Sequence, residues 1–234
     1  MLWYGYDITF LLLIPAMIAA FIAQIRMQSA YAKYRDVPNQ KGFTGAQVAQ
    51  QLLLSAGLSD IRIEVAPGEL TDHYDPQARV LRLSQGVYNG RSIAAVSIAA
   101  HECGHALQHQ EGYAPLSIRN FMVPTVSFCS MAATPLVIIG LMLSVWGGSF
   151  GMLLLDLGII FFTAVVLFQL VTLPVEFNAS KRAIAELKAQ YFILPEEEKP
   201  ARQLLSAAAM TYLASALVAI MNLLRLLILR NRRQ

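Results

Sequence analysis

Residues 120–180 contain no lysine or arginine. This stretch holds two apolar runs, at about Phe121–Trp146 and Phe150–Leu173, and between them Gly147-Gly148-Ser149 is typical of a tight turn. Each run is long enough to cross the roughly 30 Å hydrocarbon core of a bilayer as a helix. Two crossings return the chain to the side it left, so residues 121–173 are predicted to form a transmembrane hairpin.

A third apolar run, Leu2–Ile25, opens the chain, with aromatic residues at its start. No positive residue precedes its apolar core, so residues 1–26 are predicted to be a retained transmembrane anchor rather than a signal peptide. Basic residues follow directly: Arg26, Lys33, Arg35 and Lys41. Under the positive-inside rule they place the next segment in the cytoplasm and the N-terminus outside.

A fourth apolar run, Leu204–Leu229, lies within the C-terminal segment 204–234 and is followed by a basic tail. A full crossing would place Arg230, Arg232 and Arg233 outside, against the positive-inside rule. The alternatives are that only the second half inserts while the first half packs on the polar region, or that the helix lies in the membrane interface. The sequence therefore predicts three to four transmembrane helices.

The composition agrees with a membrane protein. The chain of 234 residues is 56% hydrophobic and 14% charged, and its mean hydropathy is +0.50. A net charge of +3 without a basic stripe argues against nucleic acid as a partner. Only Cys103 and Cys129 are present, so no disulfide framework is expected. Asp156 is the one charge well inside the hairpin, and a structural role is favoured for it over a functional one.

The main polar region, residues 27–120, contains local signals for a helix and a small sheet. Thr44 and Gln47 form a capping box, and Gly57 ends the helix that follows. Residues 61–65 and 79–83 alternate between apolar and charged side chains, which predicts a small antiparallel sheet. A free edge of this sheet would let an extended peptide substrate add as a strand, although a plain structural hairpin explains the pattern equally well.

The sequence His101-Glu102-Cys103-Gly104-His105 follows in a stretch rich in alanine, isoleucine and valine, with Asn89 or Ser92 as cap and Gly112 as stop. Residues four apart lie on one face of a helix, so both histidines can bind one metal ion. Glu102 lies beside that ion. This is the H-E-x-x-H arrangement of zinc peptidases, in which zinc activates water and the glutamate acts as general base.

A catalytic zinc requires a third protein ligand. His109 lies about 12 Å along the helix axis from His101, at 1.5 Å per residue, which is too far. Glu176 is the preferred candidate because it follows Pro174 in the segment 174–203, which the hairpin returns to the side of the metal helix. Acidic residues of the strand region compete with it: Glu64, Glu69, Asp72 and Asp75.

The motif at His101–His105, taken with Glu176-Phe177-Asn178-Ala179-Ser180, resembles the YugP-like neutral zinc metallopeptidases of bacterial membranes and, more distantly, the HtpX-like membrane proteases. The resemblance covers most of the chain and implies one Zn²⁺ per chain held by His101, His105 and Glu176. Ser180 stands where the HtpX-like pattern has aspartate. The residue that orients the zinc histidines is therefore open, with Asn178 as a candidate.

The resulting expectation is a mainly α membrane protein with a small cytoplasmic α+β zincin-like catalytic region. It would be a multi-pass metalloendopeptidase of the bacterial inner membrane, acting on peptides or proteins, membrane proteins among them. The oxyanion-stabilising group is open among four residues: His73, Tyr74, Arg182 and Tyr212. The rival class is a noncatalytic membrane scaffold or ion-binding protein with a degenerate metal site.

Overall fold

The computed structural model of the chain describes residues 8–144 and 149–232. They fall into two compact units. The first, here called the helical unit, consists of Met1–Ile22, Ile118–Thr172 and Tyr212–Gln234. The second, here called the α/β unit, consists of Ala23–Ser117 and Leu173–Thr211.

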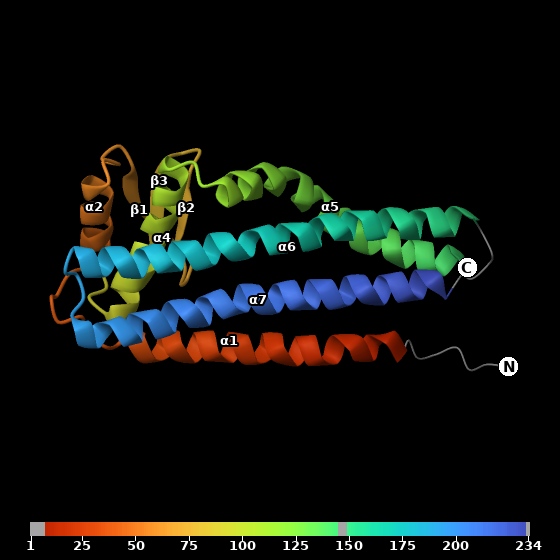
Figure 1. Cartoon of the computed structure of the whole chain (residues 1–234), viewed down its shortest axis with the longest axis horizontal. Helices are drawn as coiled ribbons and strands as arrows, with labels where there is room; N and C mark the ends of the chain where they lie inside the picture. The colour runs from red at the N-terminus through yellow and green to blue at the C-terminus, as the bar shows by residue number, and fades with distance from the viewer. Residues whose placement is uncertain (1–7, 145–148, 233–234) are drawn as a thin grey trace. The chain divides into compact units, whose positions relative to one another are not determined.

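Four helices are long and apolar enough to cross a membrane among the residues that the structure describes. They are α1 (Leu13–Arg35, preceded by the short 3₁₀ helix η1, Ile8–Leu12), α5 (Ala114–Ser144), α6 (Ser149–Ala189) and α7 (Pro195–Asn231), all visible in Figure 1. The predicted mainly α membrane fold is thus confirmed. Gly147 and Gly148 of the predicted turn and the aromatic residues at the start of the chain lie outside the described residues.

Helices α6 and α7 are both longer than the apolar runs that predicted them. Helix α6 continues through Pro174, so the second predicted span and the predicted Glu176 segment are one helix. A proline inside a helix removes one backbone hydrogen bond, and the remaining bonds of this 41-residue helix carry it past that point. Helix α7 similarly begins at Pro195, before the apolar run at Leu204.

Within the helical unit, α5, α6 and α7 pack through apolar side chains. Phe128 of α5 and Phe161 of α6 make an edge contact, with ring centroids 5.9 Å apart. Leu155 and Ile159 of α6 share a buried cluster with Leu226 of α7. One ion pair joins the same two helices, because Arg230 Nε donates to Asp156 Oδ1 at 2.7 Å. Asp156 therefore has a structural partner, and the last turns of α7 lie beside the first turns of α6.

The α/β unit contains α2 (Gly45–Ser55), β1 (Arg62–Ala66), β2 (His73–Asp75), β3 (Val80–Ser84), α3 (Gln85–Tyr88) and α4 (Ile93–Gln110). The predicted capping box is present at the start of α2: Thr44 Oγ1 accepts from Gln47 N, and Gln47 Oε1 accepts from Thr44 N. Ser92, one of the two predicted caps, accepts from Ala95 N at the start of α4.

The three strands form a mixed sheet in the order β1-β3-β2. A small sheet was correctly predicted, but the antiparallel pairing of its two alternating segments was wrong. Strands β1 and β3 pair in parallel, and it is β2 that pairs antiparallel with β3. The short β2 lacks an apolar alternation and so gave no signal. Strand β2 forms the hairpin with β3, and Asp75 Oδ1 stabilises the turn between them by accepting from Gln77 N and Ala78 N. Strand β1 therefore pairs with the opposite edge of β3, and the connection between these two parallel strands is a crossover.

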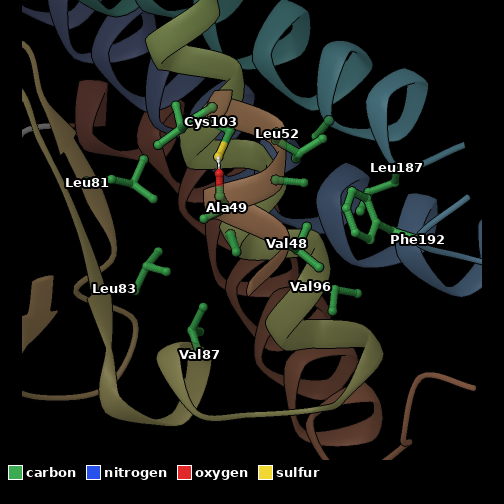
Figure 2. Close-up of a cluster of buried hydrophobic side chains, with 14 of the residues drawn as sticks. Val48, Ala49, Leu52, Leu81, Leu83, Val87, Val96, Cys103, Leu187 and Phe192 are labelled. Atoms are coloured by element: carbon green, nitrogen blue, oxygen red, sulfur yellow. Dashed lines mark hydrogen bonds between the residues drawn. The ribbon is translucent and has the colours of Figure 1, made fainter. Parts of the chain in front are cut away.

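The core of the α/β unit lies where α2, α4 and the sheet meet (Figure 2). Leu81 and Leu83 of β3 are fully buried, and they share the core with Val48 and Leu52 of α2. Leu187 of α6 belongs to the same cluster. Burying these side chains contributes about 1.5–3 kcal/mol each, which holds α4 and the second part of α6 in one packed body.

Candidate metal centre

Helix α4 presents His101 and His105 on one face, and their ring centroids lie 4.8 Å apart. Helix α6 supplies Glu176, whose side chain is only 3% exposed. Glu176 Oε2 lies 3.4 Å from His101 Nε2 and 3.8 Å from His105 Nε2. One ligand atom from each of the three residues falls within 4.8 Å of the other two. The structure therefore brings together the three residues that were predicted to bind the metal.

The cysteine of the motif faces α2 instead of α6. Cys103 is buried in the core, and its thiol donates to Ala49 O of α2 at 3.7 Å (Figure 2). Burial raises the pKa of this thiol, so it stays protonated and does not compete as a ligand. Cys103 thus anchors the helix on α2 while the two histidines face α6.

The outer nitrogens of the two histidines each have a polar partner. His101 Nδ1 lies 3.2 Å from Ser180 Oγ, and His105 Nδ1 lies 3.1 Å from Gln108 Oε1. Both rings therefore direct Nε2 toward Glu176. Such partners orient metal-binding histidines and fix the nitrogen that is left for the ion. Asn178, the candidate for this role, contacts Gln108 rather than either histidine.

Glu102 is buried, with 8% of its surface exposed, and lies next to the three-residue cluster. Burial raises the pKa of its carboxyl to about 7; the nearby His101 opposes this shift and Glu176 adds to it. A cation in the cluster would favour the carboxylate form. A buried carboxyl beside three convergent ligand atoms is the arrangement that a metal-dependent hydrolase needs for proton transfer.

Comparison with known proteins agrees with this geometry. Residues 9–231 match the family described as "Putative neutral zinc metallopeptidase". The chain belongs to this family. It is also 50% identical over 214 residues, covering 92% of each chain, to a Bacillus subtilis (strain 168) protein named "Putative membrane protease YugP". No solved structure matches the chain significantly.

The donor set of this zinc metallopeptidase family member fits zinc. Two imidazoles and one carboxylate are the protein ligands of a common class of catalytic zinc sites, which leave a further position open. Glu176 is a buried carboxylate whose surroundings include two imidazole Nε2 atoms. Burying a carboxylate costs free energy, and a divalent cation at this place would offset that cost. The residues present thus suit the ion that the family implies.

The competing ligand candidates have partners outside the cluster. His109 Nδ1 is 3.0 Å from the Tyr74 hydroxyl, as expected from its distance along α4. The four acidic residues of the strand region have other partners: Glu64 and Asp75 pair with Arg82, Glu69 with Arg35, and Asp72 with Ser84. Among the residues that the structure describes, only His101, His105 and Glu176 form a cluster of this kind.

Three of the four candidates for oxyanion stabilisation have other polar partners in the structure: His73, Tyr74 and Arg182. Tyr74 is engaged with His109, and Arg182 pairs with Glu111 through two contacts of 2.6 Å. Tyr212 belongs to the helical unit. His73 on β2 donates from Nδ1 to Thr71 O at 2.8 Å. Its Nε2 lies 3.5 Å from Arg82 Nη1, so both ring nitrogens of His73 have a partner.

Gly104 permits the close packing of α4 on α6. A Cβ atom at this position would lie 2.7 Å from the backbone oxygen of Ala179 and 3.2 Å from its Cα. Backbone atoms in a packed helix cannot move aside cheaply. Ala179 lies between Glu176 and Ser180, so the glycine determines how near both side chains come to the histidines.

We expect Gly104→Ala to lower the free energy of unfolding by about 1–3 kcal/mol, because overpacking outweighs the gain in helix propensity. It should also weaken zinc binding, since α6 must move away from α4. Gly86→Ala is the matched control, because a Cβ there meets nothing nearer than 4.0 Å. Thermal unfolding in detergent and zinc titration check both points. Equal behaviour of the two variants would contradict the close contact.

Proposed function

We propose that this protein is a membrane-embedded zinc-dependent metalloendopeptidase with one Zn²⁺ per chain. The observation that carries the proposal is the convergence of His101, His105 and Glu176 within 4.8 Å, beside the buried Glu102. Membership in a zinc metallopeptidase family supports it. His101, His105 and Glu176 would hold the ion, and Glu102 would be the general base.

A zinc ion held by these residues supplies Lewis acidity, which polarises a carbonyl and makes water acidic near neutral pH. The protein's own part in hydrolysis is proton transfer and orientation. Glu102 takes the proton of the attacking water on a carboxylate oxygen and then gives it to the nitrogen of the leaving amine. Its burial excludes bulk water from that carboxylate. Hydrolysis of the peptide bond then yields one carboxylate and one amine.

The free edge of β2 gives a place for an extended peptide substrate. Strand β2 is the outer strand of the sheet order β1-β3-β2, and its Tyr74 contacts His109 of α4. A peptide added along this edge would run beside the metal helix, with its backbone paired to β2. The substrates would be peptides or proteins, and the four apolar helices make membrane proteins the first to test.

The four apolar helices and the positive-inside rule support a multi-pass arrangement in the bacterial inner membrane, with the active site on the cytoplasmic side. Residues 1–26 and 121–173 would be spans, and residues 27–120 and 174–203 would be cytoplasmic. The segment 204–234 would cross fully. Its Arg230 pairs with Asp156 near the start of α6, which is the outward end of the hairpin. This pair offsets the basic charge that the positive-inside rule disfavours there.

We expect a reporter fused to the C-terminus to be active in the periplasm. Alkaline phosphatase, which folds only outside the cytoplasm, should be active when fused after Gln234. Fusion after Gln190, which follows the end of α6, is the control and should be inactive. If alkaline phosphatase fused after Gln234 were inactive, while a fluorescent protein fused at the same position fluoresced in the cytoplasm, the interfacial arrangement of α7 would be favoured.

The function is tested on the purified full-length protein in detergent. It should cleave an unfolded protein such as casein, lose this activity to a zinc chelator and regain it when zinc is added back. Zinc binding without cleavage of any peptide or membrane-protein substrate would favour the rival class of an ion-binding scaffold.

A further inference from the structure

Gln108 has no part in the chemistry proposed above, yet it is one of the most deeply buried polar residues described. It lies one helical turn after His105, and its side chain is fully buried. A buried amide costs free energy unless its donors and acceptor are bonded. Here they are: Oε1 meets His105 Nδ1 at 3.1 Å, and Nε2 donates to Val175 O at 2.8 Å and to Asn178 Oδ1 at 2.9 Å.

These partners decide which way the amide points. The Val175 carbonyl can only accept a hydrogen bond, so the amide nitrogen of Gln108 must face it. The amide oxygen then faces His105 and can itself only accept. His105 Nδ1 must therefore carry the hydrogen, which leaves the lone pair of the neutral ring on Nε2, on the side of Glu176.

The contact of His101 with Ser180 sets no such constraint. Its Nδ1 faces the hydroxyl of Ser180, and a hydroxyl can either donate or accept. The contact with Ser180 orients the ring but is compatible with both tautomers. The contact between His105 Nδ1 and Gln108 Oε1, in contrast, dictates the position of the hydrogen.

The contacts of Gln108 continue toward the surface. Asn178 Oδ1 also accepts from Arg182 Nε at 2.7 Å, and Arg182 binds both carboxylate oxygens of Glu111 at 2.6 Å. Arg182 can only donate, which keeps the Asn178 oxygen turned toward Gln108. Glu111 is the C-cap of α4, whereas Asn178 and Arg182 belong to α6. The series therefore joins α4 to α6 on the turns that carry His105 and Glu176.

We propose that Gln108 is a positioning residue for the metal centre. It holds His105 in the Nδ1–H tautomer, with the lone pair of Nε2 on the side of Glu176, and it ties the helix of His105 to the helix of Glu176 through Val175 and Asn178. This rests on the proposed function, in which the cluster binds zinc. Residues that orient a metal-binding histidine in this way contribute about 10–100-fold to metal affinity.

The test uses Gln108→Met, which keeps the length of the side chain and removes its hydrogen bonds. In competition with a chromophoric chelator, we expect the zinc Kd of the full-length protein in detergent to rise about 10–100-fold. Gln110→Met is the matched control on the same helix. Its amide is exposed and donates to Ala56 O, so its zinc Kd should equal that of the wild type. A wild-type Kd in Gln108→Met would overturn the proposal.

Gln108→Glu separates positioning from packing. The new carboxylate still accepts from His105 Nδ1 but cannot donate to Val175 O or Asn178 Oδ1. We expect its zinc Kd to lie nearer the wild type than that of Gln108→Met, while the unfolding temperature of the zinc-free protein falls. If Gln108→Met and Gln108→Glu had the same zinc Kd and the same loss of unfolding temperature, the role of Gln108 would be purely structural. That result would contradict the proposal.

A measurement on the wild type keeps the proposal testable if either variant fails to fold. The chain has four histidines, so selective ¹⁵N-histidine labelling gives few signals, and His105→Ala assigns the one of interest. In the zinc-free protein, with histidines neutral, Nδ1 of His105 should carry the hydrogen; a hydrogen on Nε2 would contradict the proposal. If neither wild type nor His101→Ala binds zinc, the proposed function is wrong. The tautomer of His105 in the zinc-free protein still tests the role of Gln108 in that case.

Discussion

Glu102→Gln is expected to keep zinc and lose turnover. The amide has nearly the shape of the carboxylate, so it leaves His101, His105 and Glu176 in place. It cannot take a proton from water at neutral pH, and a positioned general base contributes about 10²–10⁴-fold to the rate. We therefore expect kcat for peptide cleavage to fall by about that factor.

Zinc analysis and a cleavage assay on the same preparation check this prediction. Glu64→Gln is the control, because Glu64 lies on β1 and pairs with Arg62 and Arg82, away from the cluster. It should retain both zinc and activity. Wild-type turnover in Glu102→Gln would mean that another group moves the proton.

Glu176→Gln is expected to lose zinc and, with it, at least as much activity as Glu102→Gln. A neutral amide is a poor replacement for a carboxylate ligand, and only two imidazoles would remain. The unfolding temperature of the zinc-free variant is compared with that of zinc-free wild type, and an equal value shows that the fold is kept. Loss of zinc would then reflect a lost ligand rather than unfolding.

The acidic residues that competed with Glu176 in the sequence supply the control. Glu69→Gln should bind zinc as the wild type does, since Glu69 pairs with Arg35. If Glu69→Gln lost zinc while Glu176→Gln retained it, the third ligand would have been assigned to the wrong segment.

Much of the site followed from short-range rules. The capping signal at Ser92 and the spacing of His101 and His105 depend only on helix geometry, and both are present. The helical rise per residue is enough to exclude His109 as a ligand of the ion that His101 binds. Glu176 could be favoured because a membrane hairpin returns the chain to the side it left, and the structure does place its carboxylate beside both imidazoles.

Other features depend on contacts that no local pattern shows. Strand β2 has three residues and no apolar alternation, so its place beside β3, and hence the parallel pairing of β1, could not be read from the sequence. The continuation of α6 through Pro174 depends on the packing of Leu187 and its neighbours in the core, which offsets the lost hydrogen bond.

The partners of the two histidines likewise depend on contacts that no local sequence pattern shows. Ser180 was considered a departure from the related pattern, yet its hydroxyl lies 3.2 Å from His101 Nδ1. The one sequence signal for Gln108 is its position one helical turn after His105. Its role depends on Val175 and Asn178, which are 67 and 70 residues away in the chain.

The central claim is that His101, His105 and Glu176 form a zinc site, and metal analysis of the purified wild-type protein tests it most directly. We predict one zinc per chain after purification without chelators, with zinc absent from His101→Ala prepared in parallel. Wild-type protein that contains no zinc and takes none up on titration would contradict the claim.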